Sequence, residues 1–141
     1  IHPLLIAENA QCSYLYAKFH LKDKFPLGEH AIAKDAFYSY NYAKYVCKGS
    51  FSLGELTIAK DAYYAHMYAK YVLKSRFILA EYNIVNSDIK ILFSYVKLVV
   101  KERSLTTNFT YENNIFISEF TILYSAKINL DFNTYFAYIC A

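Results

Sequence analysis

The chain of 141 residues contains few of the residues that build compact reactive sites: three Gly, three Cys, four His and no Trp. None of the glycines lies in a phosphate-binding loop, and Cys12, Cys47 and Cys140 have no paired spacing. An odd number of unpaired cysteines argues against a secreted disulfide scaffold, so we expect reduced thiols and a cytoplasmic location. The sequence therefore predicts no metal site and no cofactor, and it predicts that the chain is not an enzyme.

Long apolar runs and strong charge are also missing. The segment 91–100 (ILFSYVKLVV) carries Lys97 and is much shorter than the roughly 20 residues of a membrane helix, so we expect no membrane association. Residues 1–78 hold ten Lys/Arg against six Asp/Glu, and residues 79–141 hold five against six, which gives net charges of +4 and −1. This asymmetry permits a polyanionic partner for the first half, although it is weaker than the charge of a dedicated nucleic-acid binder.

The chain is rich in aromatic residues, with 16 Tyr and 11 Phe, and it repeats itself. Residues 28–53 match residues 54–79 at 16 of 26 positions. The same spacing extends back over residues 2–27 and, after one inserted residue, forward over about 80–106; a degenerate unit covers 107–141. We therefore predict a single domain, 1–141, made of duplicated units.

Each unit has the pattern of two helices. The first is expected at about 27–33 and the second at about 36–48, with Asp35 as the N-cap and Gly49 in the left-handed position after the helix. A strand reading fails because the recurring Ala, Lys and Tyr positions are spaced by three and four. A 26-residue unit cannot bury its own apolar stripe, so the predicted fold is all-α: a short right-handed solenoid of stacked helical hairpins.

The aromatic positions predict a core and a surface. Tyr38, Tyr42 and Tyr45 form one helical stripe that we assign to the core, together with their counterparts Tyr64, Tyr68 and Tyr71. The loop residues Phe25, Phe51 and Phe77, with Leu27, Leu53 and Leu79, are expected to anchor the loops to the core. Phe37, Tyr40 and Tyr63 lie toward other faces, so we predict an exposed aromatic surface there, of the kind that contacts a protein partner.

Lysine recurs at two repeat positions. One holds Lys18, Lys44, Lys70 and Lys97, and the other, one helical turn later, holds Lys22, Lys48, Lys74 and Lys101. The two rows would neutralise the phosphates of an extended nucleic acid. They would equally keep the surface soluble and complement the helix dipoles, and recurring Glu29, Glu55 and Glu81 would weaken their field. We favour the structural role.

The words Ile-Ala-Lys-Asp (32–35 and 58–61) and Tyr-Ala-Lys-Tyr-Val (42–46 and 68–72), with Gly-Glu opening the unit, carry a resemblance. Over about residues 5–105 the chain resembles the short tandem helical-hairpin repeats of uncharacterised proteins of large phages and giant viruses. It is more loosely similar to leucine-rich-variant and HEAT-like repeats. The resemblance implies a repeat scaffold, with a location in the host cytoplasm or the virion.

Three functions follow as hypotheses. The first is a non-enzymatic scaffold that binds another protein, and the second is a nucleic-acid binder that uses the lysine rows. The third is a self-assembling virion component that associates through the apolar C-terminal end, 134–141 (TYFAYICA). We favour the protein-binding scaffold.

Overall fold

A computed structural model describes residues 2–103 of the chain, with side chains for residues 2–99. Within this range every regular element is helical, which confirms the all-α prediction. The predicted fifth unit, the C-terminal end 134–141, Cys140 and the side chain of Lys101 lie outside the described residues.

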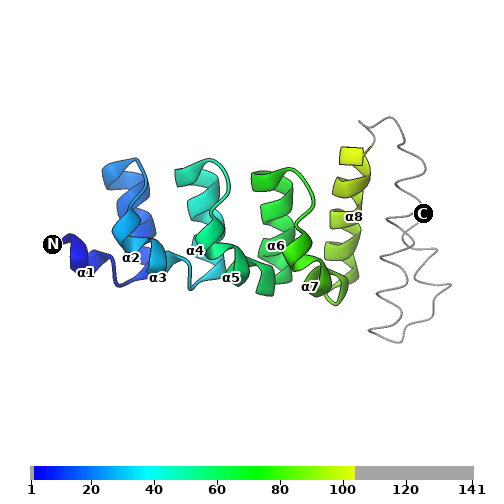
Figure 1. The fold of residues 1–141 in the computed structure, drawn as a ribbon, viewed down its shortest axis with the longest axis horizontal. Coiled ribbons are helices and arrows are strands. Elements are labelled where there is room, and N and C mark those ends of the chain that lie inside the picture. The colour runs from blue at the N-terminus through cyan, green and yellow to red at the C-terminus, as the bar shows by residue number, and fades with distance from the viewer. Residues whose placement is uncertain (1, 104–141) are drawn as a thin grey trace.

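Short and long helical segments alternate along the chain. The short segments are α1 (Pro3–Ile6), η2 with α3 (Pro26–Gly28, Glu29–Ile32), η4 with α5 (Ser52–Gly54, Glu55–Lys60) and η6 with α7 (Ile78–Ala80, Glu81–Val85). The long ones are α2 with η1 (Ala10–Leu15, Tyr16–Leu21), α4 with η3 (Ala36–Tyr42, Ala43–Cys47), α6 with η5 (Ala62–Tyr68, Ala69–Leu73) and α8 (Ile89–Arg103). The long helices stand side by side in chain order, and the short ones follow one side of the row (Figure 1).

The starts of the long helices follow the predicted chemistry. Asp35 Oδ1 accepts the N–H of Tyr38 at 2.9 Å, and Asp61 Oδ1 accepts those of Tyr63 and Tyr64 at 3.1 and 3.2 Å. An aspartate at this position satisfies donors that the first turn leaves unpaired. The prediction of these N-caps is confirmed.

The ends of three long helices differ from the prediction. Each finishes in a π-helical turn, η1, η3 or η5, and the residue that follows is left-handed: Lys22, Lys48 and Lys74 have φ of 55°, 54° and 55°. The N–H of the next residue closes the end, as when Gly49 donates to Ala43 O at 3.1 Å. Gly49 is therefore not the left-handed residue, because the wider last turn places that conformation on Lys48.

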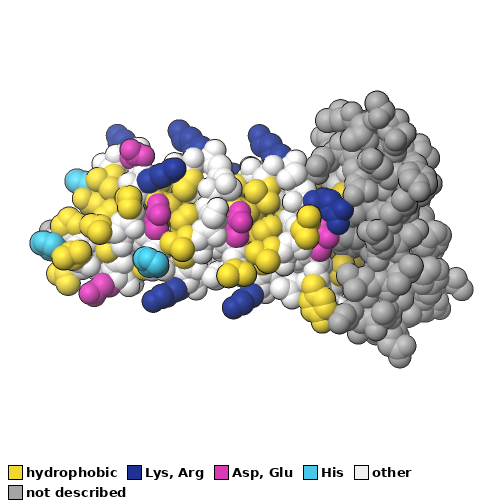
Figure 2. Space-filling model, viewed as in Figure 1, with side chains coloured by type: hydrophobic (Ala, Val, Ile, Leu, Met, Phe, Trp, Pro, Cys, Tyr) yellow, Lys and Arg dark blue, Asp and Glu magenta, His cyan; other side chains and the backbone are white. Residues whose placement is uncertain are grey.

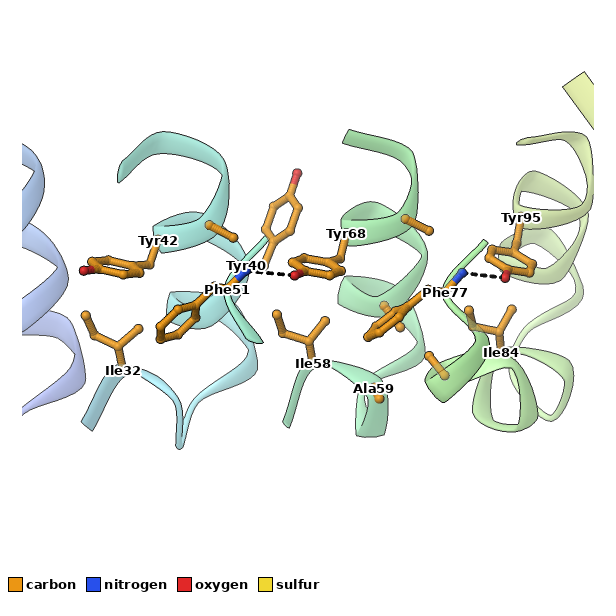
Figure 3. Close-up of a cluster of buried hydrophobic side chains, with 14 of the residues drawn as sticks. Ile32, Tyr40, Tyr42, Phe51, Ile58, Ala59, Tyr68, Phe77, Ile84 and Tyr95 are labelled. Atoms are coloured by element: carbon orange, nitrogen blue, oxygen red, sulfur yellow. Dashed lines mark hydrogen bonds between the residues drawn. The ribbon is translucent and has the colours of Figure 1, made fainter. Parts of the chain in front are cut away.

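A buried tyrosine joins neighbouring units at each of three junctions. The hydroxyl of Tyr68 accepts the N–H of Phe51 at 3.0 Å (Figure 3). It also donates to Glu55 Oε2 at 2.5 Å. Tyr42 makes the same pair of bonds with Phe25 and Glu29, and Tyr95 makes it with Phe77 and Glu81. Each bridge ties the loop of one unit to both helices of the next, so we call these bonds the tyrosine bridges.

The core is built on the same repeat positions. Ile32, Ile58 and Ile84 are fully buried, as are Tyr42 and Tyr68, and Phe25, Phe51 and Phe77 are almost so. The phenylalanines are the predicted loop anchors. The leucines assigned with them are not, since Leu27, Leu53 and Leu79 are 59%, 47% and 51% exposed. The phenyl rings fill the space over the preceding tyrosine, with ring centroids of Tyr42 and Phe51 4.9 Å apart, and the leucines point outward.

Two of the three glycines allow a close approach between helices. A Cβ on Gly54 would lie 2.6 Å from Ser39 Oγ and 2.8 Å from Ser39 Cβ, and Gly28 faces Ser13 in the same way. At the third junction the equivalent positions hold Ala80 and Ala65, both buried. Ala80 has the Cβ that Gly54 lacks, and Ala65 lacks the hydroxyl that Ser39 has, so the two changes compensate each other in volume. The backbone conformation does not require these glycines, because φ of Gly54 is −94°, which any residue can adopt. They are required because there is no room for a Cβ.

We expect Gly54→Ala to destabilise the chain by about 2 kcal/mol, because the new methyl group overpacks against Ser39 and Phe51. The double variant Gly54→Ala/Ser39→Ala reproduces the alanine pair of the third junction and should recover part of that loss. Urea unfolding of both variants and of Ser39→Ala alone gives the coupling free energy. A coupling of zero would contradict this account of the glycine.

Candidate interaction surfaces

The first surface is a row of lysines and rings at the ends of the long helices, which we call the Lys–aromatic row. Tyr45 and Tyr71 are 45% and 42% exposed, although the helical spacing predicted them in the core, and Phe19 at the same repeat position is also exposed. The π-turns explain this, because fewer degrees of rotation per residue move position 45 off the buried face that Tyr42 occupies. The row comprises Lys18, Phe19, Lys44, Tyr45, Lys70 and Tyr71.

The ammonium groups of the row reach from one unit to the next. Lys18 Nζ lies 4.4 Å from the ring centroid of Tyr45, and Lys44 Nζ lies 4.7 Å from that of Tyr71. Lys44 is also 5.1 Å from the Tyr45 ring, so this ring has an ammonium group from each of two units. These are cation–π distances. The neighbouring Tyr45 side chain raises the pKa of Lys44.

Lys97 contacts a ring of its own helix and not of a neighbouring unit, whereas Lys48 and Lys74 extend the row. Lys97 Nζ lies 4.5 Å from the ring centroid of Phe93, on its own helix α8. Lys22, Lys48 and Lys74 are exposed and left-handed, one turn after the first lysine position. The two predicted lysine positions are thus brought to one edge of the described residues.

Positive and negative side chains are separated along the long helices. Seven of the eight carboxylates among residues 2–99 lie at the starts of long helices or on the short segments, and Asp23 alone follows a long-helix end. The 12 residues of α4 and η3 span about 18 Å, so the lysine edge is well separated from most carboxylates. Figure 2 shows dark-blue side chains along the upper edge and a row of magenta ones across the middle of the face. Glu29, Glu55 and Glu81 are held by the tyrosine bridges, away from the lysine edge. Their negative charges therefore weaken the field of the lysines only over a long distance.

The second surface is apolar and lies on the short segments; we call it the apolar short-helix face. Leu27, Leu53 and Leu79 recur at one position, and Leu56 and Tyr82 at another are 65% and 51% exposed. Yellow side chains spread over this face in Figure 2. Scattered exposed apolar residues are ordinary, whereas the same exposed leucine in three successive units is a patterned surface.

The predicted aromatic surface is only partly present. Phe37 and Tyr63 are exposed at equivalent positions of α4 and α6. Tyr40 is 4% exposed, so its assignment to this surface is wrong. It stands between α4 and α6 (Figure 3), where its ring lies 5.9 Å from that of Tyr64, because a long helix within the row is covered on two sides. Its hydroxyl has no hydrogen-bond partner among the described residues, and burial raises its pKa.

Groups that could bind a metal or react were also considered among the described residues. No three His, Cys, Asp or Glu side chains among them are grouped as metal ligands. Burial raises the pKa of Cys47 and lowers that of His66, so at neutral pH both are held in their uncharged forms. None of the helices in this part of the chain has the length and apolar character to cross a bilayer.

Comparison of the chain with protein-family models, with curated proteins and with solved structures gives no match.

Proposed function

We propose that this chain is a short right-handed solenoid of tandem helical hairpins that acts as a protein-binding scaffold and carries out no catalysis. The observation that carries the proposal is the exposure of Leu27, Leu53 and Leu79, one leucine in each of three units. The core does not need these side chains, since Phe25, Phe51 and Phe77 fill the adjoining space. Recurring exposed apolar residues on a row of helices fit an extended segment of a partner protein.

The tyrosine bridges and the unit-to-unit lysine contacts support the repeat architecture in this proposal. Both link a unit to its neighbour in the sequence, as in repeat proteins whose stability is a sum of units and interfaces. The Ile-Ala-Lys-Asp and Tyr-Ala-Lys-Tyr-Val words support a viral or phage setting, with a location in the host cytoplasm or the virion.

A selection from a displayed peptide library tests the binding role. We expect peptides with several apolar residues to be enriched on the full chain. Their affinity should fall at least tenfold in Leu27→Gln/Leu53→Gln/Leu56→Gln, with unfolding free energy changed by less than about 1 kcal/mol because the leucines are exposed. The matched control is Phe37→Gln/Tyr63→Gln, which removes exposed rings from α4 and α6. Equal loss in both variants, or no enrichment, would refute the apolar short-helix face as the binding surface.

A further inference from the structure

We propose that the Lys–aromatic row is a second binding surface, which takes single-stranded nucleic acid. It is separate from the apolar short-helix face, and it combines the two elements that single-strand binding uses: a line of cations for phosphates and exposed rings for bases. Both elements recur with the unit, so the surface lengthens along the row of helices.

The rings are what distinguish this edge from an ordinary solvated lysine surface. Phe19, Tyr45 and Tyr71 occupy one repeat position, and each stands next in the chain to a lysine of the row. They are 64%, 45% and 42% exposed. A ring used only for packing would be buried at this position, as Tyr42 and Tyr68 are three residues earlier.

The ammonium groups of the row lie between neighbouring long helices, along the path that a bound nucleic-acid strand would follow. Lys18 and Lys44 each contact a ring of the following unit, so the ammonium groups bridge the gaps between long helices. Lys48 and Lys74 stand at the helix ends beside them with no ion pair among the described residues. On binding, an ammonium group moves from a ring face to a phosphate oxygen, and a base stacks on the ring face that it leaves.

The charge pattern favours a polyanion at this edge and nowhere else on the described residues. Among residues 2–99, Asp23 is the one carboxylate that follows a long-helix end. Two further lysines, Lys34 and Lys60, lie instead at the ends of short segments, near the capping aspartates Asp35 and Asp61. They provide a matched control, because they are exposed and carry the same charge.

The test titrates the full chain into labelled 20-nucleotide single-stranded RNA and DNA at several salt concentrations. Lys18, Lys44 and Lys70, together with Lys22, Lys48 and Lys74 one turn later, predict a slope of about −4 for log K against log salt. In Lys44→Gln/Lys48→Gln/Lys70→Gln/Lys74→Gln the magnitude of the slope should fall by about 3. In Lys34→Gln/Lys60→Gln it should stay within about 0.5 of the parent value, because these lysines lie outside the row.

The rings are tested separately from the charges. Tyr45→Leu/Tyr71→Leu keeps every lysine, and we expect it to weaken binding at least tenfold while the salt slope stays the same. Circular dichroism melting shows whether each variant is folded, and Tyr45→Phe/Tyr71→Phe, which retains the ring faces, should bind like the parent. A parent chain that binds neither strand at 50 mM salt overturns the proposal. So does equal weakening by the two lysine variants, or equally tight binding of polyglutamate, which would assign the edge to acidic protein segments. These outcomes leave the peptide result on the leucines unaffected.

Discussion

Replacing Tyr68 with Phe should lower the unfolding free energy by about 3 kcal/mol, although the change removes a single oxygen atom. The hydroxyl is fully buried and makes two hydrogen bonds, one from the N–H of Phe51 and one to the carboxylate of Glu55. Its loss leaves a buried backbone donor and a partly buried carboxylate without their partner, and each such group costs about 1–3 kcal/mol. Urea unfolding followed by circular dichroism measures the change.

Tyr40 provides the control for this experiment within the same core. It is almost fully buried, and its hydroxyl has no hydrogen-bond partner among the described residues. We therefore expect Tyr40→Phe to leave the stability unchanged or to raise it by about 1 kcal/mol. Phe93 stands at the equivalent position of α8, so the fold already accommodates a phenyl ring there. Equal destabilisation by Tyr40→Phe and Tyr68→Phe would show that the oxygen atoms matter only by their volume, and it would contradict the role of the tyrosine bridges.

The second large effect is alkaline unfolding. Burial raises the pKa of Tyr42, Tyr68 and Tyr95 well above the ordinary value of 10.0. The folded chain therefore keeps these protons when the unfolded chain loses them. Their contribution to stability is complete below pH 10 and is lost as the pH rises above it. Three such protons make the unfolding free energy fall by about 4 kcal/mol for each pH unit above 10.

Urea unfolding at pH 8, 9, 10, 10.5 and 11, with a reducing agent present, measures this slope. In Tyr42→Phe one bridge no longer titrates, so the slope should fall by about 1.4 kcal/mol per pH unit. Tyr45→Phe removes an exposed hydroxyl and should leave the slope as it is. A stability that is constant between pH 8 and 11 would be incompatible with three buried tyrosine hydroxyls.

The parts of the fold that local chemistry determines were predictable from the sequence. The N-caps Asp35 and Asp61 depend on a carboxylate beside free N–H groups, and the helix pairs depend on a spacing of three and four. The 26-residue duplication placed equivalent contacts in successive units, such as the bonds of Tyr42 and Tyr68. The Glu and Phe partners of these tyrosines recur with them, and this co-recurrence is the signal that the sequence offered for the bridges.

Apart from Gly49, whose expected left-handed conformation falls on Lys48, the errors concern which side chains are buried. A constant α-helical period put Tyr45 in line with Tyr42, but the π-turn Ala43–Cys47 changes the period within the helix. Tyr40 was assigned to the surface because it lies away from Tyr42, whereas a helix with neighbours on both sides buries two flanks. The repeat predicted the row of Lys18, Lys44 and Lys70, but their pairing with exposed rings followed from neither pattern, because it depends on contacts between units.

The tyrosine bridges also bear on how the chain opens. The N–H of Phe51 belongs to the loop of one unit, but its acceptor belongs to the next, so its exchange with solvent requires the two units to separate. The same holds for Phe25 and Phe77. Amide protons inside a helix report the opening of that helix, whereas these three report the opening of one junction each. Each of the three bridged junctions among the described residues therefore carries a backbone amide whose exchange measures the coupling between neighbouring units, without any substitution.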